Sequence, residues 1–122
     1  MPYNGKRYPG APGVRGLEGG ANCQLFAYEI LRANGRQIGN LRSSNLWEDT
    51  RDTFAVAEFA PLDLLLFNRT AEPHGAHIAV WIGGGRAIHL CKAIGEPATW
   101  TLAEFARHER YRVLIGAKRT RR

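Results

Sequence analysis

The sequence predicts a single α+β domain in which a helix near the N-terminus precedes a small antiparallel sheet. Apolar residues recur at helical spacing between residues 23 and 33, and short apolar runs separated by glycine follow after Pro61. The 122 residues, of which 44% are hydrophobic, suffice for one compact core. A helix followed by antiparallel strands is the order of elements typical of an α+β fold.

The two ends of the chain differ in composition from its middle. Residues 1 to 20 are rich in Gly and Pro and lack apolar periodicity, so we expect an N-terminal arm or a loop that covers a cleft. Residues 21 to 117 form the expected domain, and residues 118 to 122 form a basic tail. The net charge of +6 could favour an anionic partner. No aromatic-interleaved RNA-recognition motif accompanies this charge, so nucleic acid is not an expected partner.

The sequence also carries expectations about location. No stretch approaches the ~20 consecutive apolar residues of a membrane span, and "MPYNGKRYPGAPGVRG" lacks the apolar core of a signal peptide. We therefore expect a cytoplasmic protein without membrane contact, and leave export by a non-Sec route open. In a reducing compartment the two cysteines, Cys23 and Cys91, are expected to be free thiols.

The clearest helix signal is "NCQLFAYEILRANG". Asn22 is a suitable N-cap and Gly35 stands where the helix should end. Cys23 then falls at the first helical position, where the helix dipole favours a thiolate over a thiol. The residue is either a nucleophile at the mouth of a helix or a small buried side chain, because free cysteine is often buried as a hydrophobe.

Two shorter helices are expected. "SSNLWEDT" predicts a helix capped by Ser43 or Ser44, in which Trp47 belongs either to the core or to the wall of a cleft. "TLAEFARH" has Glu104 three positions after Thr101, which is a capping-box pattern.

Four segments after Pro61 read as strands. They are "LDLLLF" (62 to 67), "AHIAVWI" (76 to 82), "RAIHL" (86 to 90) and "RYRVLIGA" (110 to 117). Glycines at positions 83, 84 and 85 separate the second segment from the third, and therefore predict a hairpin.

The length of the hairpin loop decides whether the two histidines lie on the same face and can act together. With a three-residue loop, Ile82 pairs with Arg86 and Ala79 lies opposite His89. His77 shares a face with Ala79, so His77 and His89 become diagonal neighbours roughly 7 Å apart. A two-residue loop would instead place the two imidazoles on opposite faces of the hairpin.

Zinc binding is an alternative role for the same residues. Cys23, His77, His89 and Cys91 could supply four zinc ligands, but the sequence contains neither a CxxC nor an HxxxH spacing. We therefore expect no metal and no cofactor. The three-residue hairpin loop places Cys91 opposite His77, where it is either a packing residue or a redox partner.

Several segments together resemble a known family. They are "ANCQLFAYEILRANG", "LRSSNLW", "LDLLLF" and "HIAVWIGGGRAIHL". In order, spacing and local character they resemble the NlpC family of papain-like cysteine peptidases, over roughly residues 20 to 91. "GGGRAIH" is close to that family's Gly-x-Gly-x-x-Ile-His. The related CHAP amidases commonly have Asn, Asp or Glu at the position of His89, so the histidine favours the NlpC side.

The resemblance implies a papain-like fold and hydrolysis of an amide bond through a thioester. It implies Cys23 as the nucleophile, His77 as the base and His89 as the residue that orients His77. Gln24 would assist the backbone amides in holding the oxyanion. Ser44 and Trp47 fall at substrate-binding positions. The implied substrates are small peptides, including fragments of the bacterial cell wall (muropeptides).

Some residues depart from the family pattern. Asn22 replaces the usual Asp, Gln24 the usual Ser and Leu25 the usual Gly, so we expect a narrower cleft beside the nucleophile. Trp47 stands where a Gln is frequent, which predicts a more apolar pocket. Two alternatives therefore stay open: a cysteine-dependent acyltransferase of the same fold family, and a non-catalytic binding module with a degenerate site.

Overall fold

Six strands form one antiparallel sheet in the order β1-β6-β2-β3-β4-β5 in the computed structural model, which describes residues 2–14 and 16–122. The strands are β1 (Thr53–Val56), β2 (Leu64–Asn68), β3 (His77–Gly83), β4 (Arg86–Leu90), β5 (Pro97–Thr101) and β6 (Val113–Thr120). The helices are α1 (Cys23–Ala33), α2 (Ser43–Glu48), α3 (Leu102–Arg107) and a short 3-10 helix, η1 (Glu109–Tyr111). The predicted α+β architecture is confirmed.

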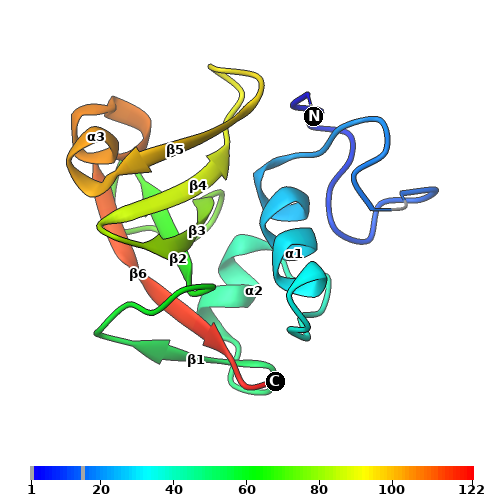
Figure 1. Ribbon diagram of the computed structural model, residues 1–122, viewed down its shortest axis with the longest axis horizontal. Coiled ribbons are helices and arrows are strands. Elements are labelled where there is room, and N and C mark those ends of the chain that lie inside the picture. The colour runs from blue at the N-terminus through cyan, green and yellow to red at the C-terminus, as the bar shows by residue number, and fades with distance from the viewer. Residues whose placement is uncertain (1, 15) are drawn as a thin grey trace.

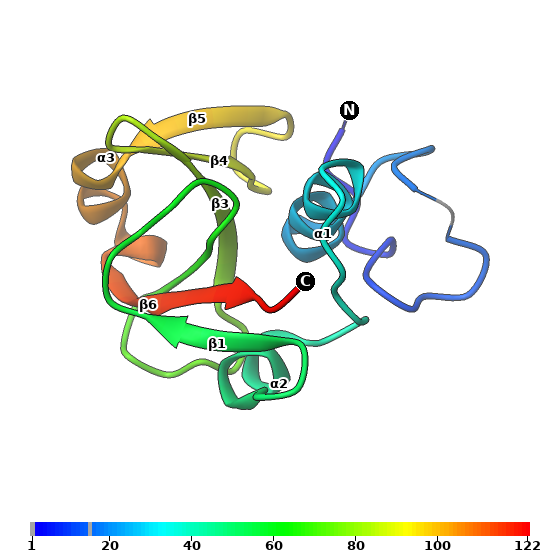
Figure 2. The ribbon, with the colours of Figure 1, turned by 60° about the horizontal axis from the view of Figure 1, so that its bottom comes forward.

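The helices lie on both faces of the sheet. In Figures 1 and 2, α1 stands between the sheet and the N-terminal segment, while α3 lies at the β5 end. Side chains of β2 alternate between two cores: Leu64 and Leu66 pack with α1, whereas Leu65 and Phe67 pack with Phe105 of α3. The side chains that surround the site therefore come from both layers. Within the described residues, none of the helices has the length and apolar character needed to cross a membrane.

Both ends of α1 form as the sequence predicts. The side-chain oxygen of Asn22 accepts a hydrogen bond from the Leu25 amide at 2.8 Å. At the other end, Gly35 has a φ of 78°, and the Arg36 amide donates to the Leu31 carbonyl at 2.9 Å. This arrangement is a Schellman motif, which glycine accommodates without strain. The Asn22 cap fixes where α1 begins and so the position of Cys23, and the Gly35 motif fixes where α1 ends.

The N-terminal segment has no helix or strand among its described residues, yet it is tied to the domain. The Tyr3 amide donates to the Gly95 carbonyl at 2.8 Å, and the Asn4 amide donates to the Ala21 carbonyl at 2.8 Å. Arg7 Nε donates to the Gly20 carbonyl at 2.9 Å. These bonds hold the segment beside the first turn of α1 and the loop that follows β4.

The β3–β4 hairpin has the predicted register along its strands but a different turn. Val80 pairs with Ile88 and Trp81 with Ala87, as expected for a three-residue loop. Next to the turn, Gly83 rather than Ile82 pairs with Arg86, because the register shifts between Trp81 and Gly83. The irregularity is a β-bulge, which absorbs one residue without moving the rest of the strand to the other face.

Other elements depart from the expectations. Strands β1 and β5 were not predicted, and residues 118 to 120, expected in a basic tail, form the end of β6. Lys118 is buried there because its ammonium donates to the Trp47 and Asp49 carbonyls at the end of α2.

Of the N-caps predicted for the two short helices, one is confirmed and one is wrong. The expected Ser43 or Ser44 cap of α2 is wrong, since Arg42 is the N-cap and makes no side-chain capping bond. The predicted capping box of Thr101 and Glu104 on α3 is confirmed.

Gly116 of β6 allows a close approach by Trp47 of α2. A Cβ added at Gly116 would lie 2.5 Å from Cη2 of the Trp47 ring. We therefore expect Gly116→Ala to lower the free energy of unfolding by about 1–3 kcal/mol, because the ring must move within a packed core. Urea denaturation measures the effect, with Gly5→Ala as control, where the nearest atoms are 3.6 Å away. Equal stability of the two variants would contradict this packing.

Candidate active site

Cys23 is the first residue of α1, and its side chain borders two adjoining pockets. The histidine-side pocket is lined, among others, by Tyr3, Arg69, His77, Cys91, Lys92 and Arg110. The serine-side pocket is lined, among others, by Gln24, Arg42, Ser43, Ser44, Asn45 and His74. Their volumes of about 280 and 350 Å³ lie near the lower end of the range for small-ligand sites. Cys23, partly exposed, stands where the two pockets meet.

The structure brings five of the six predicted site residues to these pockets or directly behind them. Gln24 and Ser44 line the serine-side pocket, and His77 lines the histidine-side pocket. His89 is 1% exposed and lies behind His77. Cys23 itself lines both pockets. Trp47 lines neither of them, because its ring packs against Gly116, so it belongs to the core rather than to the cleft wall.

His77 and His89 are joined by a short hydrogen bond. Nε2 of His77 lies 2.8 Å from Nδ1 of His89, and the two rings are nearly perpendicular, at 83°. A neutral imidazole that accepts a hydrogen bond at Nδ1 carries its proton on Nε2. In that tautomer His77 donates to His89, and His89 carries its proton on Nε2. His89 Nε2 is buried and has no hydrogen-bond partner among the described residues.

Aromatic rings enclose the two histidines. Tyr111 of η1 stacks on His77 with ring centres 4.2 Å apart, and His108 stacks on Tyr111 at 4.5 Å. Trp100 and Phe105 pack around His89, with ring centres at 4.2 and 4.7 Å. These contacts hold both imidazoles in fixed orientations, and none of the four aromatic or imidazole neighbours was predicted as a site residue.

The fold is similar to that of the crystal structure of the NlpC/p60 domain of peptidoglycan hydrolase SagA. The TM-score is 0.54 with 28% sequence identity, over 81% of this chain and 84% of that one. The chain has an NlpC-type fold. The resemblance inferred from sequence motifs is thereby confirmed, although no protein-family model and no curated protein sequence matches the chain.

Burial sets the protonation of Cys23 and His77. It raises the pKa of the Cys23 thiol, although the backbone amides of Ile78, Gln24 and Cys23 favour the thiolate. Burial, together with the nearby His89 and His108, lowers the pKa of His77 well below its usual range. The thiol and the imidazole are therefore both neutral at pH 7. This outcome differs from the expected dipole-stabilised thiolate, because the cost of burying a charge exceeds the favourable backbone contacts.

Cys91 lies close to the same site. It is 1% exposed, remains a free thiol, and packs in the core that contains Phe105 and Tyr111. It also contributes to the histidine-side pocket. Within the described residues, no group of three or more His, Cys, Asp or Glu side chains is arranged to hold a metal ion.

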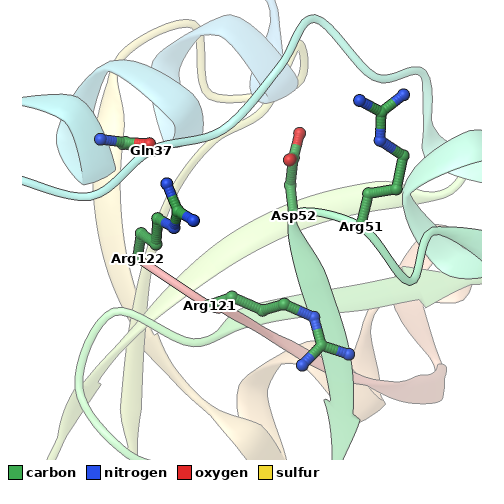
Figure 3. A pocket seen from close by; sticks show the side chains of 5 residues that line it. All are labelled: Gln37, Arg51, Asp52, Arg121 and Arg122. Carbon is green, nitrogen blue, oxygen red and sulfur yellow. The ribbon is translucent and has the colours of Figure 1, made fainter.

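A further pocket of this NlpC-type domain lies near the end of β6. It is lined by Gln37, Arg51, Asp52, Arg121 and Arg122 (Figure 3). The three guanidinium groups point in different directions, and Arg121 Nε donates to the Thr50 carbonyl at 3.0 Å. They do not converge on a common ligand position, and none of these residues lines the pockets beside Cys23.

Proposed function

We propose that the protein is a cysteine-dependent amide hydrolase that acts on small peptides of the kind found in bacterial cell walls. The observation that carries the proposal is the placement of Cys23 and His77 on one pocket, with His77 hydrogen-bonded to His89 at 2.8 Å. The similarity to a domain of a peptidoglycan hydrolase supports this class of substrate.

In the first half of the reaction, Cys23 Sγ attacks the carbonyl carbon of the substrate amide. His77 Nδ1 accepts the thiol proton as the C–S bond forms, because thiol and imidazole start neutral. The tetrahedral intermediate then collapses to a thioester, the C–N bond breaks, and His77 returns the proton to the leaving amine. His89 accepts from His77 Nε2 throughout and keeps the base in its reactive tautomer and orientation.

In the second half, water replaces the amine. His77 accepts a proton from the water, whose oxygen attacks the thioester carbonyl. Collapse of this intermediate releases a carboxylic acid and returns the proton to Cys23 Sγ, so the enzyme is regenerated. The unpaired backbone amides at the start of α1 would stabilise the oxyanion in both halves, with the Gln24 side chain in the adjoining pocket.

The test is release of free amine from a panel of γ-D-glutamyl peptides. We expect Cys23→Ala to abolish release, whereas Cys91→Ala should retain it, because only Cys23 stands at the junction of the two pockets. A thioester trapped by acid quench and mapped to Cys23 gives independent support. Activity in the Cys23→Ala variant would overturn the assignment of the nucleophile.

The panel also separates this proposal from its rivals. If Cys23 forms the thioester but water does not discharge it unless an amine or alcohol acceptor is added, the protein is an acyltransferase. If peptides bind and no thioester forms, the protein is a binding module. Either result would overturn the hydrolase proposal.

A further inference from the structure

Three cationic side chains from separate segments surround the histidine-side pocket. Arg69 follows β2, Lys92 follows β4, and Arg110 lies in η1. They are widely spaced along the sequence, yet the sheet and η1 bring all three to the pocket that contains His77. The convergence comes from the fold and not from a local run of basic residues.

Among residues 2–14 and 16–122, no acidic side chain pairs with these three cations. The ion pairs among the described residues join Arg32 to Glu29 and Arg119 to Asp63, and neither pair involves the pocket. No described residue that lines the histidine-side pocket is acidic. Like charges gathered at one rim repel one another, and an anionic ligand relieves that repulsion.

The serine-side pocket differs in charge. Besides Cys23 it presents mainly neutral polar groups, among them Ser43, Ser44 and Asn45. Its one arginine, Arg42, has its guanidinium over the Tyr8 ring at 4.7 Å. Positive charge without a protein partner is therefore concentrated on the His77 side of the nucleophile.

We propose that the histidine-side pocket is a carboxylate-binding subsite, in which Arg69, Lys92 and Arg110 select substrates that carry an acidic group next to the scissile amide. This inference rests on the proposed function for its choice of a peptide substrate. Guanidinium groups suit the role because they can pair with both oxygens of a carboxylate, and Lys92 adds a mobile point charge. A bound carboxylate would fix the orientation of the peptide across Cys23.

The experiment compares alkylation of Cys23 by iodoacetate, which is anionic, and by iodoacetamide, which is neutral and of similar size. Peptide mapping assigns each adduct to Cys23 rather than Cys91. The measured quantity is the ratio of the two rate constants. A change in the thiol pKa affects both reagents alike and cancels in this ratio, whereas attraction of the carboxylate does not cancel.

We expect the triple variant Arg69→Gln, Lys92→Gln, Arg110→Gln to lower the iodoacetate to iodoacetamide ratio by about tenfold at low salt. The control carries Arg36→Gln, Arg51→Gln and Arg107→Gln, which remove the same total charge from residues outside both pockets. Its ratio should stay within about twofold of the parent. Thermal unfolding of each variant checks that the fold is retained.

Two results would overturn the proposal. Equal decreases in both triple variants would mean that the total charge, and not this pocket, attracts the anion. An unchanged ratio in the pocket variant would mean that the three cations do not act at Cys23. Since neither reagent contains a scissile peptide, a failed hydrolysis assay leaves this result intact, and a failed alkylation result leaves the hydrolase proposal intact.

Discussion

Replacing Arg119 with glutamine is expected to lower the free energy of unfolding by about 3 kcal/mol, near the lower end for breaking a buried ion pair. Arg119 Nε donates to Asp63 Oδ1 at 2.8 Å, and a terminal nitrogen donates to Oδ2 at 3.0 Å. The Asp63 side chain is 1% exposed. Without Arg119, the Ala60 amide at 2.8 Å would be its one remaining hydrogen-bond partner in the described part of the chain.

The two members of this pair should differ in their effects. Arg119 is one-third exposed and also donates to the Glu58 carbonyl at 3.1 Å, so it can be rehydrated when its partner is lost. We therefore expect Asp63→Asn to cost less than Arg119→Gln, and the double variant to cost less than the two single changes together. Urea denaturation of the parent, the two single variants and the double variant completes this double-mutant cycle. Additive losses would show that the pair contributes no coupling.

Acid should destabilise the protein well above the pH at which exposed carboxylates titrate. Burial, with a contribution from nearby His108, lowers the pKa of His89 from 6.5 to about 4. Between these two values the unfolded chain binds a proton that the folded chain does not. Above pH 6.5 this group therefore does not change the free energy of unfolding. As the pH falls below 6.5 the free energy of unfolding decreases, by up to about 3 kcal/mol near pH 4. His77, whose pKa is also lowered, adds to the loss.

The measurement is urea denaturation at intervals between pH 7 and pH 4. A His89→Gln variant removes one of the two buried imidazoles and should show a shallower dependence on pH, whatever its absolute stability. His74→Gln is the matched control, because His74 is exposed, and it should follow the parent. The linkage to His89 is excluded if all three proteins lose the same stability over this range.

Local signals explain why much of the site could be predicted. The N-cap at Asn22 and the glycine at position 35 define a helix from nearby residues alone, so the location of Cys23 follows from the sequence. The pairing of His77 with His89 depends on one turn, and the glycines there have positive φ. A single bulge beside that turn was missed, but the faces of the strands did not change.

Long-range contacts explain what was missed. Strands β1 and β5 are the two edges of the sheet, where β1 pairs with β6 and β5 with β4. Both are short and depend on these partners, so their local sequence did not predict them. The sequence leaves Trp47 open between core and cleft wall, and the family resemblance alone implies a substrate-binding position. The ring packs in the core because Gly116 has no side chain to exclude it. The stacking of Tyr111 on His77 could not be predicted from neighbouring residues, because the contact joins segments that are distant in the sequence.

The walls of the histidine-side pocket differ in the free energy needed to open them. His77 belongs to a central strand of the sheet, and exposing it requires disruption of the core. Tyr3 belongs to the N-terminal segment, whose described residues form no helix or strand and are held beside α1 by backbone hydrogen bonds. Such segments open locally at a small fraction of the free energy of global unfolding. Widening the pocket at Tyr3 is therefore expected to cost less free energy than widening it at His77, and would leave the distance between His77 and His89 unchanged.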